Sequence, residues 1–496
     1  MIRRREFLAG AAASLVASTR PTTSSAEIQT SPDLSATAAI RAMQRGELKA
    51  EAYAGALLER ARVHKALNAF ITLDPEAVLE AARAADKKRQ SGGPLALMHG
   101  LPIPIKDSMN TRVLPTSNGT KSLRNFKPAN DAALVRRLLD QGAIVMGKTN
   151  MTELSFGWTS NNEAFGPVHN PYDPERIPGG SSGGAAAAVA ARIAPLATAA
   201  DTLGSIRVPA AMCGVSGLRP TYGRYPADGI MPLTTNKFDQ GGCVARTVED
   251  LALFDAVQTG ETAPLPAKPL KGVRIGVPPF YMAGLDPEIA KTAEQTFRRL
   301  RDGGAVIVEA EIPDVLKSAF NVAATIMLYE SHPTIAAYLE QQGTGINFDQ
   351  MFSQVSEHLG QFFRKVAMPP GRPPKDAYDA MIAKREELKE AVRAHFNQQR
   401  IEVLAFPAIA ALPPRIGVDG EVDIAGKNVS FFEAFGRNTS LGPVTGMPGL
   451  VLPMGLSEHG LPIAIEFEGL PGDDRNLLSL GMSIEKLLGP IPSPKA

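Results

Sequence analysis

The sequence predicts an α/β fold, organised as one domain around a largely buried β-sheet. Amphipathic helical stretches alternate along the chain with short apolar stretches, a pattern typical of this class. Gly-rich turns precede helix-like stretches in the middle of the chain. The chain has 496 residues and no evident internal repeat. This length exceeds that of most single domains, but large α/β enzymes do fold as one unit.

The first residues have the composition of an export signal. Arg4-Arg5 precedes Phe7-Leu8 and an apolar run over residues 9–17. The run is too short to span a membrane but suits the apolar part of a signal peptide. Twin arginines favour the bacterial Tat route. We therefore predict a Tat-type signal peptide over residues 1–26 and a periplasmic or secreted protein; the alternative is a chance basic start on a cytosolic enzyme.

After this segment, two helices rich in Ala and Leu are predicted at residues 35–60 and 75–89. An apolar strand of alternating Ile and Pro follows at residues 101–105. Residues 131–140 carry an apolar stripe at helical spacing, and residues 143–146 form a short buried strand. The first half thus alternates between helices and strands.

The middle of the chain continues this alternation. Residues 185–192 are mostly Ala, the best helix former, and residues 193–202 contain a connection and a short buried strand. A further helical stretch covers residues 208–213. Residues 247–259 form an amphipathic helix that Thr247 caps.

The second half of the chain is less regular. Residues 262–271, rich in Pro and Ala, form a linker-like connection, and the prolines of residues 368–374 require a loop. The remaining predicted elements are a strand at 273–277, helices at 287–301 and 375–397, and strands at 400–407 and 450–453.

Charge and cysteine content exclude some functions. The 52 basic and 51 acidic residues nearly cancel, so the chain lacks the electrostatic footprint of a nucleic-acid-binding protein. The seven histidines are scattered, and no Cys/His cluster has metal-ligand spacing, so we expect neither a metal nor a cofactor. Cys213 and Cys243 lie in apolar surroundings and are expected to be buried and free, with a disulfide as the alternative.

Two serines, Ser181 and Ser205, lie in Gly-rich turns that precede helical stretches. The backbone N–H groups at a helix N-terminus are unpaired and stabilise negative charge. A serine hydrolase needs such donors, because an acyl oxygen becomes an oxyanion during attack. Lys106 ends the apolar strand at residues 101–105, so burial should lower its pKa towards a neutral base; the alternative is a solvated lysine.

Two other motifs are weaker. Residues 142–149 have the spacing of a phosphate-binding loop, but here a helix precedes them and residues 143–146 form the strand themselves. The sequence Gly180-Ser-Ser-Gly-Gly184 also fits a nucleophile elbow, which would make Ser182 the nucleophile. An elbow follows a hydrophobic strand, whereas residues 170–178 form a loop.

The run GGSSGG followed by D-T-x-G-S-I-R-x-P-A resembles the amidase signature family. The resemblance is dense over residues 95–250, weaker over 430–485 and thin over 260–400. It implies a mixed β-sheet wrapped by helices on both faces. It also implies a single amidase domain over residues 27–496, with a catalytic core at about 95–250 and a variable substrate-pocket region at about 260–400.

Carried over residue by residue, the resemblance makes Ser205 the nucleophile, Ser181 a proton relay on a cis peptide, and Lys106 the base. Backbone amides at the turn would form the oxyanion hole, and nearby polar side chains would support the site. The implied oxyanion residues are Thr202, Leu203 and Gly204, beside the amide of Ser205 itself; the supporting residues are Ser182, Asp201 and Arg207; Ser155 would bind substrate. Because Asp201 and Arg207 are close in sequence, we expect them to form a fixed ion pair; the alternative is a surface arginine.

Two positions depart from the signature. Leu203 replaces a glycine, and a positive φ there would cost about 1–2 kcal/mol. Ala200 removes a hydroxyl that commonly braces the serine pair. A slow enzyme, or a degenerate member that only binds, is therefore kept as an alternative.

Residues 116–120, 125–126 and 159–162 most resemble the indoleacetamide and mandelamide hydrolases within the family. This similarity implies a small arylalkyl carboxamide as the substrate, hydrolysed to the acid and ammonia. Peptide amides and esters are alternative substrates. The expected partner is this small molecule alone, without nucleic acid or a stable membrane span, and a homodimer is considered beside a monomer.

Overall fold

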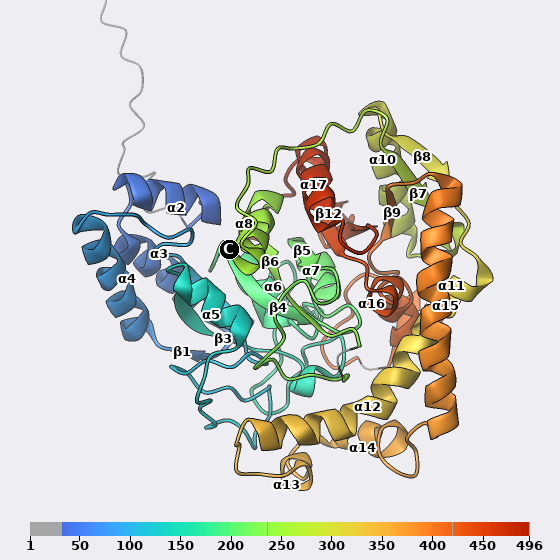
Figure 1. Ribbon diagram of the computed structural model, residues 1–496, viewed down its shortest axis with the longest axis horizontal. Helices are drawn as coiled ribbons and strands as arrows, with labels where there is room; N and C mark the ends of the chain where they lie inside the picture. The colour runs from blue at the N-terminus through green and yellow to red at the C-terminus, as the bar shows by residue number, and fades with distance from the viewer. Residues whose placement is uncertain (1–31, 236, 419, 496) are drawn as a thin grey trace, which may run out of the picture.

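The computed structural model describes residues 32–495 except Asn236 and Asp419 (Figure 1). The predicted signal peptide over residues 1–26 lies outside the described residues. Within the described part, no helix is long and apolar enough to cross a membrane. Cys213 and Cys243 are both buried and free.

A mixed eight-stranded sheet forms the centre of the described chain. Its strand order is β4 (Leu196–Asp201), β6 (Gln240–Ala245), β5 (Ser216–Arg219), β12 (Gly449–Leu456), β13 (Pro462–Glu468), β9 (Val403–Pro407), β7 (Arg274–Val277) and β8 (Val306–Glu309). Neighbours from β4 to β9 pair antiparallel, whereas β9, β7 and β8 are parallel. Strands from both halves of the sequence therefore meet at its centre.

A smaller sheet with the order β1-β3-β2 lies beside the edge strand β4. Its strands are β1 (Phe70–Leu73), β3 (Ile144–Thr149) and β2 (Pro102–Lys106). The backbone N–H of Lys106, the last residue of β2, donates to Thr198 Oγ1 of β4 at 2.9 Å. This contact brings the end of β2 to the strand that leads into the Ser205 turn.

Helices cover both faces of the large sheet. A Cβ added at Gly217 and the side chain of Leu450 lie on opposite faces, because Gly217 pairs with Val451, the residue after Leu450. A Cβ at Gly217 would meet α7, whereas Leu450 contacts α17. The helices around the sheet are α6 (Gly183–Ala190), α7 (Arg207–Cys213), α8 (Val248–Thr259), α9 (Pro279–Met282), α10 (Pro287–Asp302), α16 (Leu441–Thr445) and α17 (Asp474–Leu488). The predicted mixed sheet between two helical layers is confirmed.

Most predicted elements are present with shifted ends. The helix predicted over residues 35–60 is two helices, α2 (Ala36–Arg45) and α3 (Ala50–Val63), because Gly46 ends α2 with φ 75°. Helices α4 (Pro75–Gln90) and α5 (Ala133–Asp140) flank the small sheet. Strand β3 runs through Lys148 to Thr149, so the segment with phosphate-loop spacing is a buried strand.

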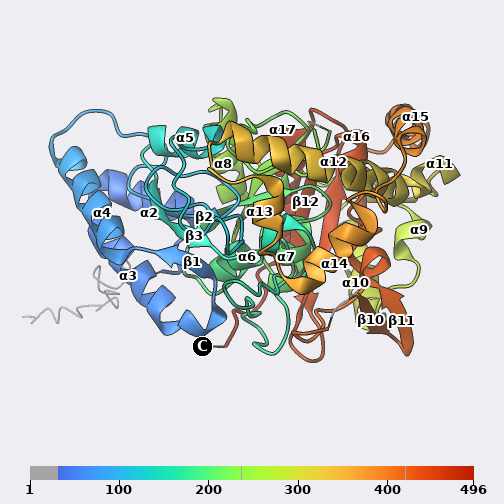
Figure 2. The ribbon, with the colours of Figure 1, turned by 90° about the horizontal axis from the view of Figure 1, so that it is seen from below.

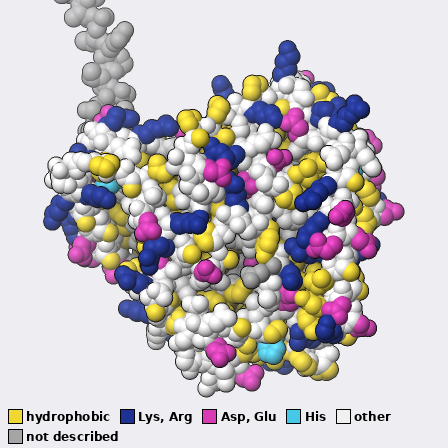
Figure 3. Space-filling model, in the orientation of Figure 1, with side chains coloured by type: hydrophobic (Ala, Val, Ile, Leu, Met, Phe, Trp, Pro, Cys, Tyr) yellow, Lys and Arg dark blue, Asp and Glu magenta, His cyan; other side chains and the backbone are white. Residues whose placement is uncertain are grey.

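A helical layer lies outside the core (Figures 1 and 2). It comprises α11 (Asp314–Lys317), α12 (Ala319–Gln341), α13 (Phe348–Phe352), α14 (Glu357–Val366) and α15 (Lys375–Gln399). The loop predicted at residues 368–374 joins α14 to α15, but α12 was missed because it lacks an apolar stripe. An apolar cluster packs α13 and α14 against loops of the core. The outer surface carries Lys and Arg interspersed with Asp and Glu on the face that Figure 3 shows.

Candidate active site

The two Gly-rich turns lie side by side at one end of β4. The first turn precedes α6 and carries Ser181, whose peptide bond with Gly180 is cis. The second turn joins β4 to α7 and carries Ser205. The backbone N–H of Ser182 donates to the Ser205 carbonyl at 3.2 Å. Ser181 is fully buried and Ser205 is 6% exposed, so only the second serine reaches the surface of the site.

A loop before α6 braces the first turn. Ser160 Oγ donates to the Gly179 carbonyl at 2.8 Å and accepts from the Gly183 amide at 3.1 Å. The Thr152 amide donates to the Ser181 carbonyl at 3.1 Å. A Cβ at Gly180 would lie within 2.8 Å of this loop, so only glycine fits there. The loop fixes Ser181 from one side.

Lys106 meets Ser181 from the other side. Its Nζ donates to Ser181 Oγ at 2.7 Å and to the Ala200 carbonyl at 3.3 Å. Burial lowers the pKa of Lys106 to about 7, although the negative charge of Asp201 opposes the shift. A substantial fraction of Lys106 is therefore neutral near pH 7 and can accept a proton.

Asp201 holds the Ser205 turn. Its carboxylate accepts from the backbone N–H groups of Gly204 at 2.8 Å and Ile206 at 3.0 Å. Arg207 Nε and Nη2 both lie 3.1 Å from the same carboxylate, so the predicted ion pair is present. Burial alone would raise the pKa of Asp201, but Arg207 brings it to about 2. The carboxylate stays ionised and fixes both peptide groups beside the serine.

The oxyanion donors differ from those expected. The Gly204 amide is engaged by Asp201, so its assignment to the oxyanion hole does not match this geometry. The amides of Leu203 and Ser205 make no hydrogen bond within residues 32–495 and are the available donors. The backbone strain that a positive φ would cause at Leu203 is also absent, because the positive φ of 98° belongs to Gly204. A Cβ at Gly204 would lie 2.7 Å from Thr439 Oγ1.

Three aromatic rings form a chain of contacts that begins at the Ser205 turn. Trp158 Nε1–H donates to the Leu203 carbonyl at 2.7 Å. The Trp158 ring meets Phe432 edge-on at 5.7 Å, and Phe320 of α12 lies 5.5 Å from Phe432. Phe432 begins a π-helix (Phe432–Gly436) and is 42% exposed. We call Trp158, Phe320 and Phe432 the aromatic wall.

Comparison with known proteins agrees with this arrangement. A profile of the Amidase family matches residues 53–478. The chain belongs to the amidase family. Indoleacetamide hydrolase of Agrobacterium vitis is 37% identical, over 87% of this chain and 92% of the relative. Mandelamide hydrolase of Pseudomonas putida is 34% identical, over 88% of each chain.

Solved structures of other amidases have the same fold as this amidase. A crystal structure described as an amidase is 30% identical, with a TM-score of 0.82 over 92% of this chain and all of the other. The peptide amidase of Stenotrophomonas maltophilia is 28% identical, with a TM-score of 0.78 over 93% of this chain and 98% of the other.

Other expected residues of the amidase make further contacts around this group. Ser182 Oγ donates to the Ala200 carbonyl at 3.2 Å rather than to a histidine. His332 packs against Phe348 in the outer layer, so it is no partner for Ser182. Thr202 bonds through its hydroxyl to Asp239, and the role of its amide in the oxyanion hole stays a prediction. Ser155 is half-buried with φ 58°, and its role in substrate binding stays a prediction.

Sequence reasoning missed the groups behind Arg207. Arg207 Nη1 lies 2.8 Å from Glu466 Oε1 and 3.6 Å from Glu468 Oε1, both on β13. Arg219 Nε lies 3.5 Å from Asp201 Oδ1. Two glutamates at alternate positions of an apolar strand were the available signal, because buried acids require a partner.

A second buried lysine lies on the strand beside Lys106. Lys148 of β3 pairs in register with Ile105, so its side chain leaves the opposite face of the small sheet from Lys106. Its Nζ donates to the Met109 carbonyl at 2.5 Å and to Thr116 Oγ1 at 2.7 Å, and lies 3.7 Å from Asp107 Oδ1. Burial lowers the pKa of Lys148 to about 8, against the charge of Asp107.

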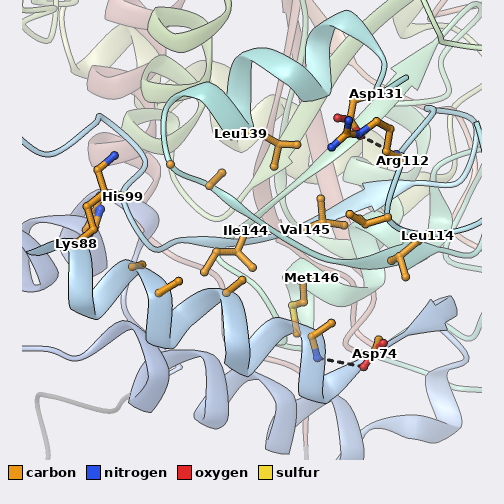
Figure 4. A pocket seen from close by; sticks show the side chains of 17 residues that line it. Asp74, Lys88, His99, Arg112, Leu114, Asp131, Leu139, Ile144, Val145 and Met146 are labelled. Atoms are coloured by element: carbon orange, nitrogen blue, oxygen red, sulfur yellow. Dashed lines mark hydrogen bonds between the residues drawn. The ribbon is translucent and has the colours of Figure 1, made fainter. Parts of the chain in front are cut away.

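A separate cavity of about 490 Å³ lies between α4, α5 and β3 (Figure 4). Leu139, Ile144 and Met146 line it, with Lys88 and Arg112 among its charged residues. Neither serine nor Lys106 reaches it. Among residues 32–495, no group of three His, Cys, Asp or Glu is arranged to hold a metal ion.

Proposed function

We propose that this amidase hydrolyses primary arylalkyl carboxamides to the carboxylic acid and ammonia through Ser205, Ser181 and Lys106. The observation that carries the proposal is the 2.7 Å hydrogen bond from Lys106 Nζ to Ser181 Oγ, in a buried site adjoining the turn of a second serine. A lysine with a pKa of about 7 has the proton affinity that a general base needs near neutral pH.

Acylation begins when Ser205 Oγ attacks the amide carbonyl carbon. Its proton passes to Ser181 Oγ, whose own proton passes to neutral Lys106. The carbonyl oxygen becomes an oxyanion near the Leu203 and Ser205 amides, which stabilise it. The C–N bond then breaks as the nitrogen receives the proton back from Lys106 through Ser181. Ammonia leaves, and the acyl group remains as an ester on Ser205.

Deacylation repeats these steps with water in place of the serine. Water attacks the ester carbon and gives its proton to Lys106 through Ser181. The Ser205 oxygen recovers that proton as the ester bond breaks, and the carboxylic acid is released. One water is consumed for each amide, and Lys106 ends the cycle neutral.

The aromatic wall supports an aryl group in the substrate. Trp158 is fixed by its hydrogen bond to the Leu203 carbonyl, two residues before the nucleophile, and the exposed Phe432 faces its ring edge-on. Aromatic rings prefer such offset or edge-on neighbours. The 37% and 34% identical relatives are named for hydrolysis of indoleacetamide and mandelamide, which both carry an aryl group near the amide.

Ammonia release from a panel of amides tests the proposal. Indole-3-acetamide, mandelamide and phenylacetamide should exceed acetamide in kcat/KM by about 10- to 100-fold, the value of burying one aromatic ring. A peptide amide, an ester and a chelator complete the panel, and chelation should leave the rate unchanged. Equal rates for acetamide would overturn the aryl assignment, and no hydrolysis at all would favour a protein that only binds.

Variants of the aromatic wall localise the aryl site. Phe432→Ala should raise KM for indole-3-acetamide about 10-fold while leaving acetamide hydrolysis nearly unaltered, because only the aryl group contacts the ring. Phe432→Tyr, which keeps the ring, is the matched control. A KM that is unaffected in Phe432→Ala would place the aryl group elsewhere.

We also propose that the amidase is exported by the Tat route, on the support of Arg4-Arg5 and the apolar run over residues 9–17. Replacing both arginines by lysine should retain the precursor in the cytoplasm. N-terminal sequencing of the periplasmic protein should find a start near Glu27; a start at Met1 in both compartments would overturn the proposal. The homodimer stays a prediction, which sedimentation equilibrium tests.

A further inference from the structure

A group of five charged side chains lies directly beneath the Ser205 turn. Glu466 and Glu468 are two residues apart on β13 and therefore leave the same face of the sheet, towards α7. Both lie near Arg207 of α7, which also pairs with Asp201 at the end of β4, and Arg219 of β5 lies near Asp201 in turn. All five side chains are fully buried.

The charges in this group do not balance if every carboxyl is ionised. Three carboxyl groups face two guanidinium groups, which leaves one negative charge in excess. An uncompensated buried charge is strongly unfavourable, and a buried carboxyl avoids this penalty by keeping its proton. One proton held among the three carboxyls makes the group neutral.

The contacts show where that proton fits. Asp201 receives two backbone N–H groups and Arg207, so it has no need of a proton. Glu466 Oε2 and Glu468 Oε2 are both buried and receive no conventional donor from the described chain. The Oε1 atoms of both glutamates approach the same Arg207 Nη1, so the two carboxyl groups lie beside each other. Two adjacent carboxyl groups can hydrogen-bond to each other only when one of them carries a proton.

We propose that Glu466 and Glu468 share one proton and act as positioning residues for the Ser205 turn, through Arg207 and Asp201. Arg207 Nη1 binds Glu466 Oε1 at 2.8 Å, and its Nη2 donates to the Thr439 carbonyl at 2.7 Å. The guanidinium so placed holds Asp201, which holds the amides on either side of Ser205. The positioning role of Glu466 and Glu468 in catalysis rests on the function proposed above. The shared proton is independent of that function.

Glu468 is the member that carries the proton. It lies farther from Arg207 than Glu466 does, at 3.6 Å against 2.8 Å. Burial and the neighbouring Glu466 raise the pKa of Glu468 well above its usual value. The charged or titratable groups that face the pair from other elements are Arg207, Arg219, Asp201 and Tyr281 of α9.

Matched substitutions at Glu468 distinguish the effect of the hydrogen-bond donor from the effect of side-chain size. Glu468→Gln keeps a donor towards Glu466 and should retain kcat within about threefold, whereas Glu468→Leu should lower kcat about 100-fold by displacing the turn. KM should vary less than kcat, because the turn acts mainly on the transition state. Equal losses in both variants would overturn the role of the proton.

The pH profile gives a second readout. Loss of the shared proton at alkaline pH places two adjacent negative charges beneath the turn, so wild-type kcat should fall there. The Gln side chain has no proton to lose, so this alkaline fall should disappear in Glu468→Gln. An alkaline fall that persists in Glu468→Gln would contradict the proposal.

Infrared spectroscopy tests the proton without any substrate. The wild-type protein at neutral pH should show the C=O absorption of a buried protonated carboxyl, and Glu468→Gln should lack it. Identical spectra would overturn the shared proton. If the wild-type protein hydrolyses no amide, the proposed function fails on its own, and the infrared difference still decides whether the proton is shared.

Discussion

Lys106 and Lys148 lie on neighbouring strands of one small sheet, and both are fully buried. Burial lowers the pKa of each, to about 7 for Lys106 and about 8 for Lys148. Their partners differ. Lys106 bonds to the hydroxyl of Ser181, whereas Lys148 bonds to a carbonyl and a threonine hydroxyl and faces the Asp107 carboxylate.

The difference shows that desolvation alone does not make a lysine a base. Lys148 has a nearby negative charge that favours its ammonium form and no hydroxyl that leads to a nucleophile. Lys106 has a neutral hydroxyl whose proton it can exchange. The same lowered pKa therefore serves structure on one face of the sheet and chemistry on the other.

The largest effect is expected when the catalytic lysine or the nucleophile is removed. Lys106→Ala and Ser205→Ala should each lower kcat by about 10⁴-fold or more, because these groups act as one unit. Circular dichroism should show a folded protein in both variants. Wild-type turnover in Ser205→Ala would refute the mechanism, and a loss confined to Ser182→Ala would point to the nucleophile elbow.

Removal of the other lysine should act on stability instead. Lys148→Met leaves Asp107 buried without its cation and should lower the free energy of unfolding by about 3–5 kcal/mol, measured by urea denaturation. The double variant Lys148→Met/Asp107→Asn should recover part of this loss, because it removes both charges. A stable Lys148→Met protein without turnover would show that the two lysines do not divide their roles in this way.

The pH dependence separates the two lysines without altering the catalytic residues. Only neutral Lys106 accepts a proton, so kcat/KM should rise about tenfold per pH unit below pH 7 and level off above it, until the alkaline fall expected from loss of the proton shared by Glu466 and Glu468. The rise follows loss of a proton from the free enzyme. Folded Lys148→Met should keep the same midpoint; a midpoint displaced towards pH 8 in the wild type would assign the titration to another group.

A smaller effect on activity is expected from substitution of Leu203, which lies in the same site as Lys106. Its φ is not positive, so Leu203→Gly relieves no strain and only removes a side chain that is 4% exposed beside Trp158. We expect kcat/KM for an aryl amide to fall about 10-fold or less. Leu203→Met is the control for volume. A faster Leu203→Gly enzyme would mean that the turn is strained after all.

Local sequence patterns were sufficient to predict the site of Lys106, Ser181 and Ser205. An apolar strand that ends on Lys106 predicted burial, and the two Gly-rich turns predicted adjoining helix starts. The ion pair of Asp201 with Arg207 was also predicted, since the two residues are close in sequence. The spacing of residues 142–149 was correctly attributed to a strand, which the burial of Lys148 explains.

Contacts between distant segments could not be predicted in the same way. Glu466 and Glu468 reach Arg207 only because β13 pairs with β12 and β12 with β5. Phe320, Trp158 and Phe432 come from three separate segments, and no local periodicity connects them. The Gly204 amide was assigned to the oxyanion hole because a motif gives the order of the backbone amides but not the direction in which each N–H points. The glutamate contacts, the aromatic wall and the direction of this N–H all depend on tertiary packing.

The bond between Arg207 and Glu466 joins residues 259 positions apart. During synthesis at about 5–20 residues per second, Arg207 leaves the ribosome roughly ten to fifty seconds before its partner exists. Strand β12 is also absent from the centre of the sheet for most of that interval, and the glutamates that hold Arg207 beneath the Ser205 turn are missing. Nascent chains stalled before residue 462 should therefore show no turnover, whereas release of the full chain should start it. Ser205 is therefore translated early but can act as a nucleophile only after β13 is complete. An unfinished chain is expected to have no amidase activity.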